Sequence, residues 1–325
     1  MFLLEIAALE PDAYPEWDTF VAESPQGTIF HTSWWLDCSG HRFELFGLFK
    51  NGKLVAGLPI VYWRWRFWDM ITQPPFTPYQ GLMFAPTEGK YVTQLSMHKK
   101  LAEALIDAIK NRASVINICC HWTINDMQPF RWAGFEPQVH YTYLLDLQNY
   151  SAIWPNMDST KRNNIRRSKD EGITVAEGFN IPELIRLSKD TFDRQSMNVN
   201  WDMLPKTYQY ELNKRGLGRT FIAYTPAREA IAGLLLVWDN RCAYYLMGGY
   251  KQEAAHRGAM SLAFWQAINY AHTIGLQTFD FEGSDVPQIE RFFRKFGARL
   301  TPYYRARKTS RWLESYLSLR RLLPI

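Results

Sequence analysis

Apolar positions along the chain switch between a period of two and a period near 3.6, most clearly within residues 243–306. Phe264, Ile268 and Ala271 lie at i, i+4 and i+7, the spacing of one helix face. The runs on either side are short, aromatic or β-branched and bounded by glycine, which is typical of strands. The block therefore predicts strand, helix, strand, helix, strand over residues 243–250, 258–274, 277–281, 286–296 and 300–306.

The first half of the chain repeats this order of elements. Two strands meet at Asn51-Gly52, a strong signal for a tight hairpin turn. A helix, a hydrophobic strand, a short helix and a last strand follow over residues 99–112, 115–120, 127–133 and 138–147. Both short helices carry phenylalanine and stop at glycine, as FRWAGF at 130–135 and FRKFGA at 293–298. A repeat of this length indicates domain duplication.

Length and composition agree with two domains. The chain has 325 residues, of which 15% are aromatic, enough for two cores. We expect an α/β fold class with mixed sheets, arranged as two tandem domains. The expected boundaries are 1–150 for the N-terminal domain, 151–309 for the C-terminal domain and 310–325 for a terminal helix that docks on the body.

Composition also excludes several classes of protein. No apolar run approaches the roughly 20 residues of a membrane-spanning helix, and residues 1–10 lack the pattern of a signal peptide. The four cysteines lack metal-ligand spacing, so no metal site is expected and a reducing cytoplasm is the simplest location. A formal charge of +5 permits an anionic ligand but does not by itself indicate nucleic acid.

Residues 159–172 (STKRNNIRRSKDEG) predict a strongly basic helix, capped by Asp158 or Ser159. Arg162, Arg166 and Lys169 fall on one face by their i, i+4, i+7 spacing. Two alternatives stay open for this face. It is either solvated, as most charged faces are, or it holds a phosphate-bearing ligand.

Several of these segments resemble the Fem-type aminoacyltransferase relatives, which belong to the GNAT acyltransferase superfamily. The C-terminal half carries YYLMGG at 244–249, Gly258-Ala259, FDFEGS at 279–284, FGA at 296–298 and Tyr303. The N-terminal half carries an aromatic entry segment with His31, Trp34 and Trp35, and PYQGL at 78–82. The resemblance implies two GNAT-like domains that arose by duplication.

The resemblance also implies an N-acyltransferase that moves an acyl or aminoacyl group onto an amine, such as that of a cell-wall or sugar precursor. The partners would be a small-molecule donor and an amine acceptor. The donor is left open between acyl-CoA and aminoacyl-tRNA. No sustained heptad supplies the coiled-coil arm of the classical Fem enzymes, which weakens the case for tRNA.

Donor binding is expected at the start of the helix predicted from residue 258. GNAT-type enzymes bind the donor's pyrophosphate there, on free backbone N–H groups. His256, Arg257, Gly258 and Ala259 occupy the corresponding positions, although the superfamily's first and last signature residues are changed. Substrate contacts are expected from the basic helix, through Lys161, Arg162 and Arg166, and from the aromatic pair Trp35 and Tyr79. The alternative for the aromatic entry segment is a cluster that closes the core.

Asp280 and Glu282 are the candidate catalytic carboxylates, because acyl transfer to an amine needs a general base. They alternate along one predicted strand, so both are expected on one face. One would act as the base and the other would orient it, with a purely structural Asp280 as the alternative. Tyr304 is the candidate general acid. The lysine of the relatives' Phe-Lys-x-x-Phe-Gly segment is Phe293 here, so a second function stays open, a catalytically inactive GNAT pair that binds a phosphorylated ligand.

Overall fold

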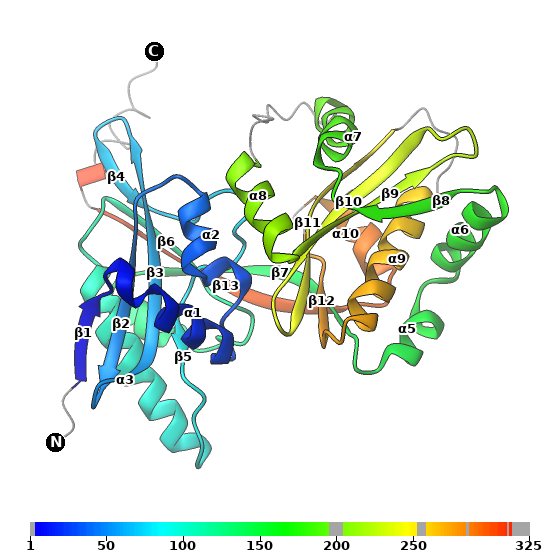
Figure 1. Cartoon of the computed structure of the whole chain (residues 1–325). Coiled ribbons are helices and arrows are strands. Elements are labelled where there is room, and N and C mark those ends of the chain that lie inside the picture. Colours follow the sequence, from blue (N-terminus) through cyan, green and yellow to red (C-terminus); the bar gives the residue numbers. More distant parts are fainter. Residues whose placement is uncertain (1–3, 195–203, 252–257, 284–285, 311, 314–325) are drawn as a thin grey trace, which may run out of the picture. The chain divides into compact units, whose positions relative to one another are not determined.

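A computed structural model describes residues 4–194, 204–251, 258–283, 286–310 and 312–313 (Figure 1). Its contacts divide the chain into two compact units. Unit 1 comprises Met1–His140 and Pro302–Ile325, and unit 2 comprises Tyr141–Thr301. Each unit contains strands and helices around its own hydrophobic core. The expected α/β fold class with two duplicated domains is confirmed.

Unit 1 begins with an antiparallel sheet. Its first strands are β1 (Leu4–Ala8), β2 (Phe43–Lys50) and β3 (Lys53–Trp65). β2 and β3 form the predicted hairpin, in which Asn51 and Gly52 adopt φ values of 53° and 74°, as a type I′ turn requires. A second hairpin was not predicted. Arg66 turns the chain at φ 57°, so β3 pairs with β4 (Trp68–Ile71).

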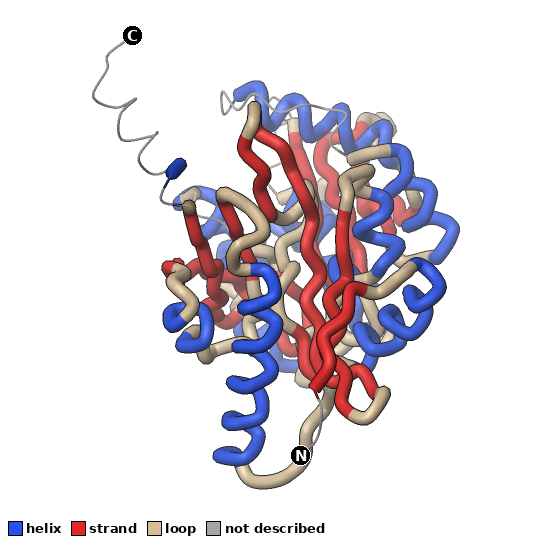
Figure 2. Tube along the Cα trace, turned by 90° about the vertical axis from the view of Figure 1, so that its left-hand side faces the viewer, coloured by secondary structure: helices blue, strands red, loops and turns tan. Residues whose placement is uncertain are grey.

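The core of unit 1 is built on α3 (Tyr91–Ile109). Leu101, Leu105 and Ile109 of this helix pack on buried residues of the strands, and Figure 2 shows the helix running alongside them. α3 connects β4 to β6 (Val115–Cys119) in parallel. The remaining elements are η1 (Pro11–Ala13), α1 (Tyr14–Glu23), η2 (Ile29–His31), α2 (Ser33–Cys38), β5 (Met83–Phe84) and α4 (Gln128–Trp132).

Unit 2 repeats the same connection. β11 (Cys242–Tyr250) leads through α9 (Ala259–Thr273) to β12 (Thr278–Asp280), which pairs with β11 in parallel. β8 (Thr174–Gly178), β9 (Gly218–Tyr224) and β10 (Ala230–Trp238) extend this sheet antiparallel. The helices are α5 (Tyr150–Asn156), α6 (Ser159–Asp170), α7 (Ile181–Arg194), α8 (Lys206–Arg215) and α10 (Pro287–Arg294).

Helices α7 and α9 cover opposite faces of the unit 2 sheet (Figure 1). Phe221 and Ala223 of β9 belong to the core that includes Phe264 of α9, whereas Ile222 between them packs with Leu187 of α7. This alternation is what a strand buried on both faces shows. It also explains the paired glycines of β11, because a Cβ on Gly249 would lie 2.4 Å from the Leu187 carbonyl oxygen.

In each unit, one strand pairs with a strand that is distant in the sequence. β13 (Arg299–Thr309) follows unit 2 in the chain, yet Arg305–Thr309 pair antiparallel with β6 of unit 1. β7 (Glu136–Asp146) follows α4, yet Leu144–Asp146 pair antiparallel with β12 of unit 2. The chain thus supplies each unit with a strand next to its parallel pair, and unit 1 is assembled from two separate stretches of sequence.

Most long periodic segments were predicted correctly, and the differences are local. Residues 27–39 were expected to bring a strand into a helix. They form η2 and α2 instead, with Thr32 capping α2 by accepting from the Trp35 N–H. Among the described residues, no helix has the length and apolarity needed to cross a bilayer. The expected terminal helix at 310–325 falls almost wholly outside the described residues.

Candidate active site

The strands β11 and β12 separate within unit 2. Their parallel register covers three pairs and ends at Tyr244↔Asp280. β11 continues beside β10 to Tyr250, after a register shift that leaves Leu246 as a bulge residue. Beyond β12 the Phe281 N–H donates to the Tyr143 carbonyl on β7, at 3.0 Å. A bulge bends its strand, so β11 turns away at the point where β12 ends.

Asp280 anchors this strand end. Its side chain is fully buried, and its Oδ1 accepts a hydrogen bond from the Thr142 hydroxyl and another from the Glu282 N–H, at 2.8 Å. Charge-assisted bonds of this kind are about twice as strong as neutral ones. Asp280 therefore holds the main chain of the loop that follows β12, and its role in orienting a catalytic base stays a prediction.

Glu282 does not continue the strand, contrary to the expectation that both carboxylates would share one face. It adopts φ 58° and Gly283 adopts φ 63°, so two successive residues are left-handed. A Cβ on Gly283 would lie 1.9 Å from the Tyr141 carbonyl oxygen, so only glycine fits there. A left-handed conformation costs a non-glycine residue about 1–2 kcal/mol, and its retention at Glu282 marks a constrained position.

The Glu282 carboxyl group lies in an environment that disfavours its charge. Oε1 is buried and makes no hydrogen bond within the described part of the chain. Burial, and secondly the charge of Asp280, raise the pKa of Glu282 well above its ordinary value. A carboxyl group with a raised pKa is a stronger base once ionised, which is the property needed to take a proton from an amine.

Tyr245 is a neighbouring group that the sequence interpretation missed. It follows the last parallel pair of β11, and its ring packs on Phe264 and Phe293 with centroids 4.8 and 5.7 Å away. Burial, and secondly the charge of Glu282, raise the pKa of Tyr245. The sequence carried no signal for this role, because the bulge that follows Tyr245 is visible only in the strand pairing.

Lys161 is buried within unit 2, with only 4% of its surface exposed. Its Nζ lies 3.3 Å from the ring centroid of Phe292 and 4.6 Å from that of Phe296, and donates to Ser261 Oγ at 3.2 Å. Burial lowers the pKa of Lys161 to about 7. The buried face of α6 is formed by Lys161, Ile165 and Ser168, so the basic helix packs through one of its own lysines.

The start of α9 is closed by α6. Gly258 and Ala259 are buried, and a Cβ on Gly258 would lie 2.2 Å from Ser168 Oγ and 2.3 Å from the Asn164 carbonyl oxygen. The glycine is therefore required by helix–helix approach. His256 and Arg257, the other two residues expected at a donor site, lie outside the described residues.

Comparisons with known proteins agree with this geometry. The family model "Acetyltransferase (GNAT) domain" matches residues 158–317. The structure is similar to that of FemX, with a TM-score of 0.70, 14% identity and coverage of 92% of this chain and 96% of that one. Residues 158–317 thus match a GNAT domain, and the chain as a whole shares its fold with FemX.

Two further structures share the fold of this chain. One is L-PGS from Bacillus licheniformis, with a TM-score of 0.57, 13% identity and coverage of 96% of both chains. The other is a tandem GNAT protein from the clavulanic acid biosynthesis pathway, with a TM-score of 0.54, 11% identity and coverage of 94% and 98%. No curated protein sequence gives a significant match.

The two arginines of α6 that were expected to contact substrate differ in what they bind. Arg162 donates through Nη1 to the carbonyl oxygens of Trp154, Pro155 and Met157, which close the end of α5. Its guanidinium thus has a structural role in α6. Arg166 is exposed and lies 5.5 Å from the Trp154 ring. Of the two arginines, Arg166 is the one open to an external anion.

The expected aromatic contacts lie in the core of unit 1. Trp35 is fully buried and donates through Nε1 to Thr77 Oγ1 at 2.9 Å, and Tyr79 is 1% exposed. His31 accepts from the Gly81 N–H at Nε2, and burial lowers its pKa to about 3, so this ring is neutral. These positions favour the alternative of a cluster that closes the core.

Tyr304, the expected general acid, also belongs to unit 1. It packs against the core of that unit, and its carbonyl accepts from the Cys120 N–H at 2.8 Å. The candidate carboxylates Asp280 and Glu282 belong to unit 2, so the role of Tyr304 stays a prediction. Within the residues that the structure describes, no group of three histidine, cysteine or acidic side chains could hold a metal ion.

Proposed function

We propose that this chain is an acyltransferase that moves an acyl or aminoacyl group onto an amine, with Glu282 as the general base. The observation that supports this most directly is the buried carboxyl group of Glu282 at the point where β11 and β12 separate. The GNAT fold and the similarity to FemX support acyl or aminoacyl transfer in general.

The proposed chemistry begins with the acceptor's ammonium group, which gives one proton to the Glu282 carboxylate. The resulting amine attacks the donor's carbonyl carbon, and the tetrahedral intermediate collapses with loss of the thiolate or alkoxide. That leaving group takes a proton from an acid. The attacking nitrogen still carries one proton too many, and it gives this proton to the conjugate base of that acid, so that a neutral amide forms. Tyr304 was predicted for this role, and Tyr245 is a second candidate because it keeps its proton beside Glu282.

Asp280 and Lys161 would act as positioning residues in this proposal. Asp280 fixes the main chain at Glu282 through the 2.8 Å hydrogen bond to its N–H. Lys161 ties α6 to Ser261 in the first turn of α9. Both side chains are buried, so their contribution comes from holding the loop and the helix in place.

The donor and the acceptor are proposed from the resemblance. Acyl-CoA and aminoacyl-tRNA are the two donors to be tested, and an amine of a cell-wall or sugar precursor is the acceptor to be tested first. The four cysteines are buried free thiols, which supports the proposed reducing, cytoplasmic location.

The test compares turnover of Glu282→Gln with that of the parent chain, using acetyl-CoA and an aminoacyl-tRNA as donors. We expect kcat to fall by about 10²–10⁴-fold with little change in the donor's KM. The rise of rate with pH that ionisation of Glu282 produces should disappear as well. Glu177→Gln, an exposed glutamate on β8, is the matched control and should keep full activity.

Unchanged turnover in Glu282→Gln would contradict the assignment of the base. The raised pKa gives an independent check that the variant is folded. Ionising Glu282 in the folded chain is unfavourable, so Glu282→Gln should be at least as stable as the parent at pH 8, and the difference should shrink toward pH 5. If no donor gives turnover in the parent chain, the alternative of an inactive pair that binds a phosphorylated ligand takes its place, with exposed Arg166 as its first candidate contact.

A further inference from the structure

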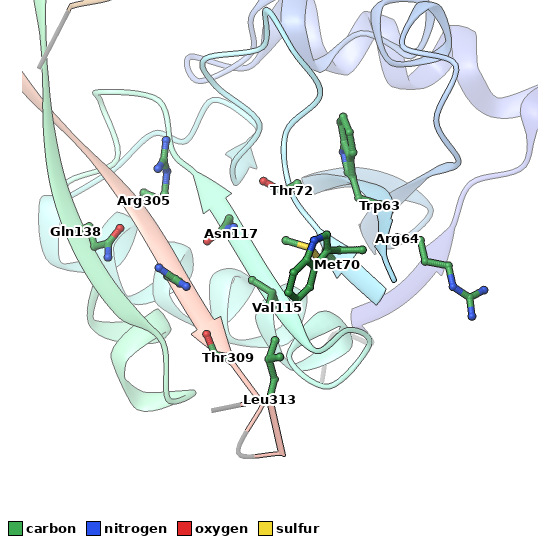
Figure 3. Close-up of a pocket in the computed structure, with 12 residues that line it drawn as sticks. Trp63, Arg64, Met70, Thr72, Val115, Asn117, Gln138, Arg305, Thr309 and Leu313 are labelled. Carbon is green, nitrogen blue, oxygen red and sulfur yellow. The ribbon is translucent and has the colours of Figure 1, made fainter. Parts of the chain in front are cut away.

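A pocket of about 560 Å³ lies on one face of unit 1 (Figure 3). It extends across four neighbouring strands, β3, β4, β6 and β13, each of which pairs with the next. The residues that alternate with its lining, such as Ile71, Ile116 and Ala306, belong to the hydrophobic core. The pocket therefore lies on the sheet face opposite to α3.

The floor of the pocket is ordered in rows across the strands. Trp63 pairs with Met70, Met70 with Val115, and Val115 with Thr309, which gives one largely apolar row. Two residues further along β6, Asn117 pairs with Arg307 of β13, and this pair begins a polar row. Two residues beyond Asn117, Cys119 pairs with Arg305. Side chains two residues apart on a strand share a face and lie about 7 Å apart. The pocket is thus apolar on one side and cationic on the other.

The charge of the lining has one sign. Its 12 residues include Arg64, Arg305 and Arg307, and none is acidic. Arg64 is exposed, and its side chain extends away from the others in Figure 3. Arg305 lies beside the Cys119 thiol, whose pKa is raised by burial, so that neighbour keeps its proton and adds no negative charge.

Two hydrogen-bond donors of the lining are buried without a partner in the described part of the chain. They are Nε of Arg305 and Nε1 of Trp63. A buried polar group that lacks a partner costs about 1–3 kcal/mol, and more when the group is charged. Both groups can only donate, so the partner that would satisfy them must be an acceptor.

From these observations we propose that the pocket binds an organic phosphate whose other end is a flat ring or a short hydrocarbon. Arg305 and Arg307 hold the phosphate oxygens, and Asn117 adds an amide donor. The ring or hydrocarbon covers the apolar row of Trp63, Met70 and Val115. A volume of 560 Å³ suits a ligand of that size. This site is independent of Glu282 and of the reaction proposed for unit 2.

The first experiment measures binding of 1-naphthyl phosphate to the full chain by isothermal titration calorimetry. Inorganic phosphate and 1-naphthol are the two half-probes. Because the pocket engages both ends, naphthyl phosphate should bind at least about tenfold more tightly than either half. Its affinity should fall as salt is raised, since the arginines attract the phosphate electrostatically.

Variants connect the binding to these residues. Arg305→Met should weaken naphthyl phosphate by about tenfold or more, whereas Arg64→Met, which removes the same charge from the exposed rim, should leave affinity within about twofold. Trp63→Leu should weaken naphthyl phosphate but not inorganic phosphate. If Arg305→Met melts at a lower temperature than the parent, Arg307→Ala, at an exposed position, supplies the same comparison.

Two natural classes of ligand carry this chemistry, nucleotides and lipid phosphates. Uridine monophosphate tests the first class and dihexanoyl phosphatidic acid tests the second, with dihexanoyl phosphatidylcholine as the zwitterionic control. At least one of the two phosphomonoesters should bind in an Arg305-dependent manner, and that one identifies the source. The proposal is overturned if neither binds, if naphthyl phosphate fails to bind, or if Arg305→Met and Arg64→Met change its affinity equally.

Discussion

At the scale of single residues, the most informative side chain is Lys161. An ammonium group that is 4% exposed has lost most of its hydration, and the two phenylalanine rings and Ser261 replace it only in part. The pKa of about 7 expresses that shortfall. A buried charge that costs stability is a candidate for function, and Lys161 holds α6 against α9 through Ser261.

Replacement of Lys161 by methionine should therefore stabilise the chain near neutral pH. Methionine has a similar length and needs no hydration, so the free energy of unfolding should rise by about 1–4 kcal/mol at pH 6–7. Thermal unfolding measured at several pH values provides the test. Lys169→Met, on the exposed face of the same helix, is the control and should change stability by less than about 0.5 kcal/mol.

The pH dependence of this effect has a definite sign. Below pH 7 the lysine is charged in both the folded and the unfolded chain, so the penalty is complete. Between pH 7 and 10.5 the folded chain has lost the proton that the unfolded chain still holds, so the parent gains stability relative to Lys161→Met as pH rises. A variant less stable than the parent at pH 7 would show instead that the contacts with Phe292 and Phe296 outweigh the lost hydration.

At the scale of elements, the contact of α6 with the first turn of α9 decides how the second half is assembled. The position of Gly258 at the start of a helix suggested an anion site, because such starts expose N–H groups. The structure gives this glycine a packing role, since any Cβ would meet the backbone of α6. The two roles predict different consequences for one substitution.

Gly258→Ala should lower the free energy of unfolding by about 1–3 kcal/mol, because α6 and α9 must move apart to admit the methyl group. Chemical denaturation measures this directly. Gly178→Ala is the control, since a Cβ there meets nothing within 4 Å and its φ is ordinary. If Gly258→Ala instead left stability unchanged and weakened donor binding, the result would favour an anion-binding role for Gly258.

At the scale of the whole molecule, the main feature is that unit 1 is not a continuous segment of the chain. The first 140 residues lack β13, whose residues Arg305–Thr309 pair with β6. A sheet whose strand edge is left open exposes unpaired backbone groups and apolar surface. Unit 1 should therefore depend on residues that follow unit 2 in the chain.

A fragment of residues 1–140 should be poorly folded, whereas the same fragment joined by a flexible linker to residues 299–313 should unfold cooperatively. Circular dichroism during thermal unfolding distinguishes the two outcomes. A fusion with residues 299–313 in scrambled order controls for chain length. Equal cooperativity of the bare fragment and the fusion would show that β13 is dispensable for unit 1.

The sequence by itself determined the elements with a strong local signal. Asn51-Gly52 specified its turn through backbone preference alone, and the apolar spacing of Phe264, Ile268 and Ala271 specified α9. β1, α5 and β8 were not predicted, because short elements carry too few residues for a periodic signal. The duplication was visible because both halves repeat one order of elements.

The candidate site was only partly accessible from sequence. Asp280 and Glu282 were recognised as neighbours, but strand alternation could not show that Glu282 turns left-handed, since that depends on the close approach of Gly283 to Tyr141. The spacing of its charged residues predicted the basic helix but not which residue it buries. Lys161 faces inward because Phe292 of α10 and Phe296, which follows that helix, lie against its ammonium group.

Tertiary structure alone decided which strands complete each unit and where the unit 1 pocket forms. Arg305 and Trp63 are more than 200 positions apart in the sequence, and only strand pairing places them in one lining. Local propensity acts between residues close in the chain, whereas burial, pKa and pocket chemistry depend on groups that folding brings together from far apart. That is why the sequence predicted the type of fold, while the roles of Lys161, Gly258 and Arg305 emerged only from their surroundings.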